Sequence, residues 1–421
     1  YLHPFVLGRN IEEAMKQAQS QVQEGYRYSY DMLGEAARTQ ADADKYYQAY
    51  YDAITKLGQS NISTTIYDAP CMSVKLSALH PRYEYRQREW IVPILVARIK
   101  TLALHAKANH LSLTIDAEEA ELLDLSLDIF EMLLKDPAFT DWDGLGLAVQ
   151  AYQKRAVPLI KWLIDLARKQ GSRIPVRLVK GAYWDTEIKR AQMEGLEDYP
   201  VFTRKVNTDI SYLACAKLML AAQDVIYPQF ATHNAYSVAA ILTLMGNNYR
   251  DYEFEFQNLQ GMGKALHDHI VRKDQMDLPC RIYAPVGSHE ELLPYLVRRL
   301  LENGANSSFV NQIADRKTPI EKLVISPMAK LKKLGVIANP KISLPKNLFG
   351  KNRVNSMGFD FSHLLALENL MKAMEVAGNK TWEAAPFSKS VTKGKSIINP
   401  MNHQQLLGRV EEATVEDIKK A

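Results

Sequence analysis

Two cations stand in the stretch RLVKGAYWD, whose first residues have the apolar pattern of a buried strand. Burying unpaired charge costs free energy, so Arg177 and Lys180 need anionic partners. Just beyond them, Gly181 and Ala182 allow another group to approach the backbone closely, and Trp184 offers a flat apolar surface for a ring. We therefore predict a site here for a large polar ligand that carries a ring and an anionic part.

A second candidate is a pair of adjacent arginines on a predicted helix, in the stretch YLVRRLLENGANSSF. Arg298 and Arg299 point about 100° apart on such a helix. Adjacent arginines are typical of a solvated face. The alternative is that the helix crosses the mouth of the fold and both guanidinium groups hold one carboxylate, for which they are well suited. The sequence leaves both interpretations open.

Several other kinds of site are not indicated. No GxGxxG follows a strand and no GxxxxGK[ST] occurs, so the sequence has neither a dinucleotide fingerprint nor a P-loop. His233 has no carboxylate cluster beside it, and the HDH of residues 267–269 lies outside the expected strands, so we expect no metal site. No serine or cysteine stands in a GxSxG elbow.

The elements that must position these residues alternate along the chain. Short apolar runs, each followed by a longer amphipathic segment, begin near residue 70. Such alternation predicts a parallel sheet, and about eight units in roughly 250 residues predict an α/β fold of the (β/α)8 TIM-barrel type. A doubly wound open sheet is the alternative. The seven expected strands, with a candidate eighth last, are residues 71–79, 111–119, 144–152, 176–184, 228–234, 252–259, 280–287 and 307–312.

The expected strands have one apolar and one polar face. Alternate residues of a strand point to opposite sides, and helices cover the outside of a barrel, so the polar face must line the interior. Active sites of such barrels lie at the carboxyl ends of the strands. Internal ion pairs without a function are the alternative interpretation. The polar residues expected inside or at those ends are Lys75, Asp116, Gln150, Arg177, Thr232, His233, Asn234 and Tyr283.

The remaining segments lie on both sides of the barrel. We expect a helical arm over residues 1–60, the barrel over 61–315, a linker and a helix over 316–390, and a hairpin with the start of a helix over 391–421. The chain begins with Tyr rather than Met, so we expect a fragment. Its net charge of +4 over 421 residues gives no argument for nucleic-acid binding. Its three cysteines lie far apart, which is typical of a reducing compartment.

Seven stretches resemble the proline dehydrogenase domain of the bacterial bifunctional proline utilization A family: GYRYSYDMLGEAA, VKLSALHPRYEY, TIDAEE, RLVKGAYWD, FATHN, CRIYAPVG and YLVRRLLENGANSSFVN. The resemblance implies non-covalent FAD at the carboxyl end of a (β/α)8 barrel. It also implies oxidation of L-proline to Δ1-pyrroline-5-carboxylate, by hydride transfer from proline C5 to flavin N5, as the first step of proline catabolism to glutamate. Electrons would pass to a membrane quinone, with the protein cytoplasmic and peripherally membrane-associated.

The end of the chain resembles the connection into that family's aldehyde dehydrogenase domain and the first residues of it, in the stretches SHLLALENLMKAM and INPMNHQQLLGRVEEATVEDI. We therefore expect no aldehyde dehydrogenase activity from this chain. DNA binding would depend on an N-terminal segment that this sequence does not include.

The resemblance implies two neighbouring sets of site residues and no metal. Three cations would hold the proline carboxylate and lower the amine pKa by like-charge repulsion, while two tyrosine rings and a leucine would contact the proline ring. These substrate residues are Lys75, Asp116, Tyr183, Leu259, Tyr283, Arg298 and Arg299. The flavin residues, with Arg177 near N5, are Gln150, Arg177, Val179, Lys180, Gly181, Ala182, Trp184, Thr232, His233, Asn234, Glu302, Ser308 and Phe309.

Two other functions stay open from the sequence. The chain could be a different flavin barrel that oxidises another cyclic imino acid, or a scaffold or binding module without activity. Rates of flavin bleaching by proline, hydroxyproline and pipecolate would separate the enzymes. Colourless protein that takes up no FAD would indicate the binding module.

Overall fold

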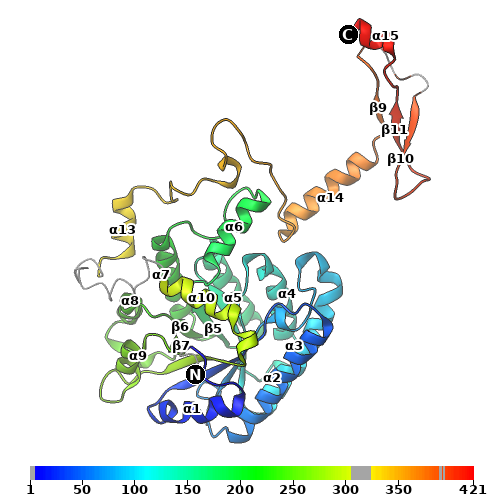
Figure 1. The fold of residues 1–421 in the computed structure, drawn as a ribbon. Coiled ribbons are helices and arrows are strands. Elements are labelled where there is room, and N and C mark those ends of the chain that lie inside the picture. The colour runs from blue at the N-terminus through cyan, green and yellow to red at the C-terminus, as the bar shows by residue number, and fades with distance from the viewer. Residues whose placement is uncertain (1–4, 305–323, 388–390, 392–393) are drawn as a thin grey trace. The chain divides into compact units, whose positions relative to one another are not determined.

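Eight parallel strands close into a barrel in the computed structural model, which describes residues 5–304, 324–387, 391 and 394–421 (Figure 1). Each strand pairs with the next along the chain, and the last pairs with the first, so the (β/α)8 prediction is confirmed and the open sheet is excluded. The strands are β1 (Arg27–Met32), β2 (Cys71–Val74), β3 (Ser112–Ile115), β4 (Leu145–Gln150), β5 (Ile174–Val179), β6 (Ile226–Ala231), β7 (Glu255–Leu259) and β8 (Cys280–Val286).

The first strand of the barrel, β1, was not expected from the sequence. β1 lies in the segment expected to be a helical arm, and it pairs with both β2 and β8. Its sequence, RYSYDM, has no aliphatic residue before its last position, so it does not look like a core strand. Tyr28 and Tyr30 stack with ring centroids 5.6 Å apart on one face, while Ser29 and Asp31 are buried on the other. The candidate eighth strand over residues 307–312 lies outside the described residues.

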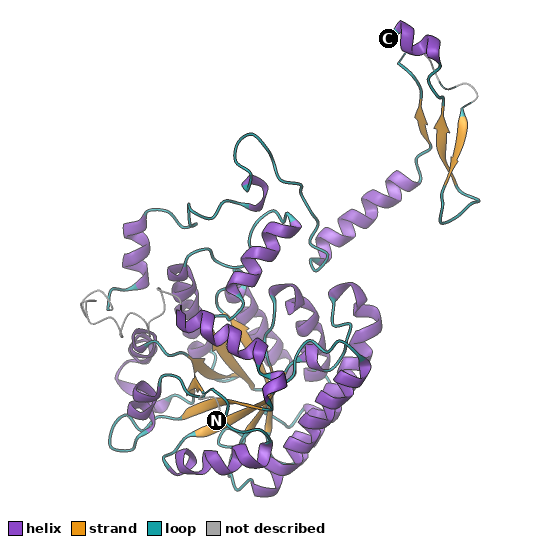
Figure 2. Ribbon diagram, in the orientation of Figure 1, coloured by secondary structure: helices purple, strands orange, loops and turns teal. Residues whose placement is uncertain are grey.

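Helices surround the strands (Figure 2). The expected helices on either side of β1 are present: Asn10 caps α1 by accepting the N–H of Glu13, and Thr39 forms a capping box with Asp42 at α2. The helices of the barrel unit are α1 (Ile11–Gln23), α2 (Gln40–Ser60), α3 (Arg88–Ala108), α4 (Leu123–Leu134), α5 (Ala156–Gln170), α6 (Trp184–Glu194), α7 (Lys205–Ala221), α8 (Ala235–Met245), α9 (Lys264–Val271), α10 (Leu293–Gly304) and α13 (Pro327–Leu334).

The chain divides into two compact units, Tyr1–Gly358 and Phe359–Ala421. In the first, part of the expected linker lies against the barrel: Asn207 donates to the carbonyl of Ile337, and Tyr199 donates to that of Ser343. The second contains the expected helix and hairpin. Its elements are α14 (Leu364–Gly378), β9 (Trp382–Ala384), β10 (Lys395–Ile398), β11 (Leu406–Val410) and α15 (Val415–Lys420).

The described residues include neither a candidate membrane span nor a candidate metal cluster. Among the helices that the structure describes, none is both long and apolar enough to cross a bilayer. Nor do three or more His, Cys, Asp or Glu side chains gather as metal ligands within the described ranges.

Candidate active site

The polar strand faces meet inside the barrel, as predicted. Arg177 of β5 lies at the centre of this interior and is 4% exposed. Its Nε donates to Gln257 at 2.9 Å and its Nη1 to Asp116 at 2.6 Å, while Nη2 donates to Ser29 and Ser73. Burial alone would lower the pKa of Arg177, but the Asp116 carboxylate raises it. Four of its five N–H groups therefore have partners among the described residues, and one on Nη1 is left for a ligand.

A second cation lies beside this guanidinium. Lys75 Nζ is 2.7 Å from Asp31 Oδ2 and 3.5 Å from Asp116 Oδ2, and it donates to the Tyr283 hydroxyl at 3.3 Å. Tyr283 in turn donates to Asp116 at 2.7 Å. The Tyr283 hydroxyl therefore connects the Lys75 ammonium group to the Asp116 carboxylate.

The pKa values of the two carboxylates in this cluster are shifted in opposite directions. Burial raises the pKa of Asp31, and Lys75 only partly opposes this. Burial also acts on Asp116, but there the charges of Arg177 and Lys75 prevail and lower its pKa. Asp116 is therefore the ionised partner of both cations. Asp31 keeps one buried oxygen without a hydrogen-bond partner in the described part of the chain.

The adjacent arginines of α10 are not on a solvated face. Arg298 forms a two-pronged ion pair with Glu35, at 2.5 and 2.8 Å, and its guanidinium lies 5.1 Å from the centre of the Tyr183 ring. Arg299 is buried, pairs with Glu302 at 2.8 Å and leaves its Nε without a partner among the described residues. The same helix packs against Tyr283 through its apolar residues. The helix thus lies over the barrel interior, as the alternative interpretation expected, but its two arginines pair with different carboxylates of the chain rather than with one.

One expectation about these cations was wrong. We expected an anionic ligand to compensate them, but carboxylates of the chain already do so. Four of the five partners lie at least 29 positions away in the sequence, which is why they were not found, whereas Glu302 is one helical turn after Arg299. The pairs are Lys75 with Asp31, Arg177 with Asp116, Lys180 with Asp209, Arg298 with Glu35, and Arg299 with Glu302.

The residues expected at the floor of a flavin site run from the end of β5 into α6. Lys180 donates to Asp209 and to Ser237, and Trp184 donates from Nε1 to the carbonyl of Phe202. Ala182 is exposed, and the others are half-buried. The members of this group are Val179, Lys180, Gly181, Ala182 and Trp184. They therefore offer side chains and backbone at the carboxyl end of the barrel.

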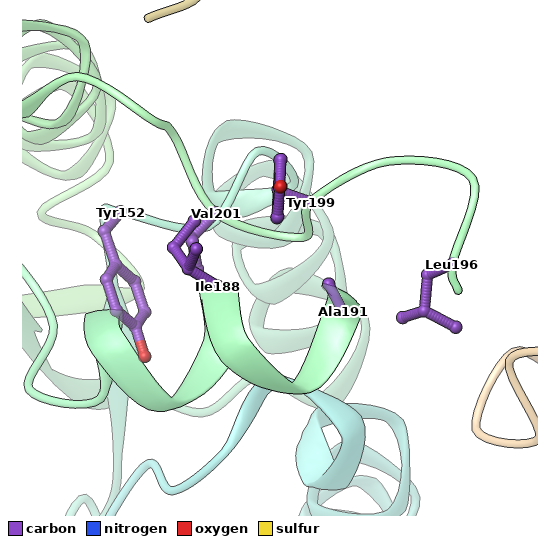
Figure 3. Packing of buried hydrophobic residues seen from close by; sticks show 6 residues of the cluster. All are labelled: Tyr152, Ile188, Ala191, Leu196, Tyr199 and Val201. Atoms are coloured by element: carbon purple, nitrogen blue, oxygen red, sulfur yellow. The ribbon is translucent and has the colours of Figure 1, made fainter. Parts of the chain in front are cut away.

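Gly181 is the position of this floor at which only glycine fits. Its φ is 134°, and an added Cβ would lie 2.4 Å from the ring of Tyr152. That ring belongs to a buried cluster with Ile188 and Ala191 of α6 (Figure 3). The floor and α6 are thus packed against one shared apolar cluster.

Gly181→Ala should lower the free energy of unfolding by about 3 kcal/mol, because backbone strain and overpacking both act. Gly171→Ala is the matched control: its φ is 64°, but nothing lies within 4 Å of an added Cβ. There we expect only the left-handed backbone cost of about 1 kcal/mol. Urea unfolding of both variants measures the difference. Equal losses would contradict the close approach to Tyr152.

The segment after β6 contacts the end of β7. Asn234 caps α8 by accepting the N–H groups of Tyr236 and Ser237, and Thr232 accepts the N–H of Asn234. His233 accepts the Leu259 N–H at Nε2, so its other nitrogen carries the proton and lies 3.7 Å from Glu302 Oε1.

Of the remaining expected site residues, the structure describes Gln150 but not Ser308 or Phe309. Gln150 donates to the carbonyl of Glu118 and accepts from Gln153. Ser308 and Phe309 lie outside the described residues.

Two carboxylates of the site, Asp31 and Glu35, were not expected from the sequence, although both stand in the quoted stretch GYRYSYDMLGEAA. The signal that could have found Asp31 is its position in an alternating run, on the same face as Ser29.

Glu118 is a buried carboxyl group near this site. It accepts the N–H of Ser77 at 3.1 Å, and burial raises its pKa to about 8. Between the ordinary glutamate pKa and about pH 8, the folded protein therefore holds a proton here that the unfolded chain has released. Since the folded state binds more protons, this group makes the free energy of unfolding fall as the pH rises through that window.

Glu118→Gln should remove the contribution of this carboxyl group to the pH dependence of the free energy of unfolding. The slope that one such group contributes is at most about 1.4 kcal/mol per pH unit. We expect the loss of stability between about pH 6 and pH 8 to be smaller in Glu118→Gln than in the unmodified protein, as measured by urea unfolding at both values. Parallel pH profiles of the two proteins would refute the assignment.

Comparisons with known proteins agree with this geometry. The family model described as proline dehydrogenase matches residues 14–312. Bifunctional protein PutA of Klebsiella aerogenes is 48% identical over 429 residues, which cover 99% of this chain and 33% of that protein. Proline dehydrogenase 1 of Bacillus subtilis (strain 168) is 24% identical over 307 residues, which cover 73% of this chain and 88% of that protein.

Solved structures show the same relationship. The crystal structure of a bifunctional proline utilization A (PutA) protein matches with a TM-score of 0.83 and 48% identity, covering 93% of this chain and 39% of that one. PutA from Bdellovibrio bacteriovorus, inactivated by N-propargylglycine, matches with a TM-score of 0.84 and 27% identity over 99% of this chain and 44% of that one. The chain spans about a third of the length of the curated PutA relatives that it matches. It belongs to the proline dehydrogenase family.

Proposed function

We propose that the chain oxidises L-proline to Δ1-pyrroline-5-carboxylate with bound FAD, as the first step of proline catabolism to glutamate. The observation that carries the proposal is the group of cations around two tyrosine rings: Lys75 touches Tyr283, and Arg298 lies over Tyr183. Proline is a small apolar ring with a carboxylate. Cations suit its carboxylate, and aromatic walls suit its ring.

The residues present fit a flavin. Arg177 offers one remaining N–H from the centre of the barrel, and the buried Nε of Arg299 has no partner among the described residues. Val179, Gly181 and Trp184 offer half-buried surface at the carboxyl end of β5 and the start of α6. When bound, FAD would supply the hydride acceptor. We propose that the floor segment, the residues after β6 and Glu302 hold it, with Gln150 at the edge of its ring.

The chain's own residues would act by positioning and by electrostatics. Lys75, Arg298 and Arg299 would hold the proline carboxylate, while Tyr183, Tyr283 and Leu259 would contact its ring and exclude water. Because these cations disfavour a further positive charge nearby, they would lower the pKa of the proline amine. The amine would then lose its proton more readily, which prepares the ring to give up hydride. Orientation in a closed site supplies a large part of the rate enhancement.

Further parts of the proposal rest on similarity to PutA alone. We propose that a membrane quinone takes up the electrons and that the protein is cytoplasmic and peripherally membrane-associated. We also propose that residues from Phe359 onward lead into an aldehyde dehydrogenase domain. DNA binding would need a segment other than those described.

The test is the visible spectrum of the purified chain after incubation with FAD. We expect flavin absorbance to stay with the protein on gel filtration and to bleach when proline is added without oxygen. Hydroxyproline and pipecolate should bleach it more slowly. Protein that retains no flavin would refute the proposal. Faster bleaching by hydroxyproline would indicate that hydroxyproline is the substrate. Hydroxyproline dehydrogenase of Bos taurus is also a relative, 31% identical over 222 residues.

A further inference from the structure

We propose that Gln257 is a positioning residue for Arg177 and that Glu255 fixes the orientation of the Gln257 amide. The inference rests on the proposed function, in which Arg177 lies near the flavin. It concerns Gln257 and Glu255, two buried residues of β7 that are not among the expected site residues.

Gln257 connects two charged groups of opposite sign. Its Oε1 accepts the Nε–H of Arg177 at 2.9 Å, and its Nε2 donates to Glu255 Oε1 at 2.7 Å. An amide presents an acceptor on one side and donors on the other. Arg177 can only donate, and a carboxylate can only accept, so the amide satisfies both neighbours in one orientation only. Gln257 is 1% exposed, so bulk solvent does not compete for these contacts.

Glu255 itself is held from the other end of the barrel. Its oxygens accept from Arg281 at 2.7 and 3.1 Å and from Arg27 at 3.2 Å. Arg281 also donates to the carbonyls of Tyr28 and Ala69. Arg27 and Glu255 are the first residues of β1 and β7. A continuous series of hydrogen bonds therefore runs from the amino-terminal end of the barrel to Arg177.

The contact from Gln257 controls the plane of the Arg177 guanidinium group. Asp116, Ser29 and Ser73 hold its Nη atoms, but among the described residues only Gln257 holds Nε. The guanidinium lies 5.0 Å from the centre of the Tyr283 ring. Without the contact from Gln257, the buried Nε–H of Arg177 has no partner. The guanidinium plane can then rotate relative to the Tyr283 ring. A displacement of about 1 Å at a reacting centre can cost about a hundredfold in rate.

Gln229 is a matched control inside the same barrel. It lies on the neighbouring strand β6, is 4% exposed and donates to the same Glu255 Oε1, at 3.0 Å. Its own Oε1 has no hydrogen-bond partner among the described residues. Methionine at either position removes one hydrogen bond to Glu255 at nearly constant volume. Only Gln257→Met also removes the contact to Arg177.

The experiment compares Gln257→Met with Gln229→Met in the FAD-loaded chain. We expect a larger fall in unfolding temperature for Gln257→Met than for Gln229→Met, because only Gln257→Met leaves the buried Nε of Arg177 unpaired. Gln257→Met should lower kcat for proline at least about tenfold with KM changed less than about twofold, whereas Gln229→Met should change kcat by less than about twofold. The midpoint potential of the bound flavin should fall only in Gln257→Met, because a displaced cation stabilises the reduced anionic flavin less.

Equal kcat values and equal potentials in the two variants would overturn the inference. If Gln257→Met does not fold, Gln257→Asn replaces it, since its shorter side chain withdraws the carbonyl from Nε with little loss of volume. The unmodified protein separates this inference from the proposed function. Unmodified protein that holds no flavin refutes the function, whereas active unmodified protein with two equivalent variants refutes only the role of Gln257.

Discussion

Asp116→Asn should reduce kcat/KM for proline by about a hundredfold or more, because the neutral amide cannot balance two buried cations. The carboxylate contacts Arg177 at 2.6 Å, Tyr283 at 2.7 Å and Lys75 at 3.5 Å. Removing one partner of a buried charge pair costs about 3–5 kcal/mol, since the remaining charge stays desolvated. Because Asp116 holds three groups of the candidate site, part of that cost should appear as misplacement of Arg177 and Tyr283.

Steady-state kinetics and urea unfolding measure the two parts separately. Asp124→Asn is the control, because Asp124 accepts from Arg155 at 2.9 Å with side chains 36% and 39% exposed. Such exposed pairs contribute at most about 1 kcal/mol. We expect near-normal activity and stability from the control. Activity of Asp116→Asn within about threefold of the unmodified protein would show that the cluster does not organise the site.

The barrel could be predicted largely from local patterns. Strands such as LGLAVQ of β4 are apolar up to their last residue, Gln150, which is typical of a buried parallel strand. β1 could not be recognised in this way, because tyrosine rings provide its apolar face and its other face carries Ser29 and Asp31. Its place became clear only when closure of the barrel required a strand between β2 and β8.

The polar faces of the strands were predictable, but their pairing was not. Alternation places Lys75 and Arg177 inside the barrel whatever their partners are. Their partners depend on the stagger between strands, which a single strand does not reveal. Arg177 reaches Ser29 across 148 positions of the sequence, and Arg298 reaches Glu35 across 263. A ligand therefore seemed necessary to balance charges that distant carboxylates balance in the folded chain.

The ion pair at the amino-terminal end of the barrel should have the largest effect on stability. Arg281 and Glu255 are 1% and 0% exposed, and two hydrogen bonds join them. Burial alone would raise the pKa of Glu255, but Arg281 lowers it, so the carboxylate is ionised at neutral pH. We expect Glu255→Leu and Arg281→Leu each to lower the free energy of unfolding by about 3–5 kcal/mol, because each leaves an unpaired buried charge.

The double variant Glu255→Leu with Arg281→Leu should lose clearly less than the sum of the two single losses, because it leaves neither charge unpaired. Urea unfolding of all four proteins measures the coupling. The exposed pair Arg168 and Asp224, with side chains 52% and 58% exposed, is the matched control and should show almost no coupling. Additive losses at the buried pair would mean that the two charges are solvated independently. Coupling there would instead show that Arg281 holds the Glu255 carboxylate in place. Glu255 could then orient Gln257 and, through it, Arg177.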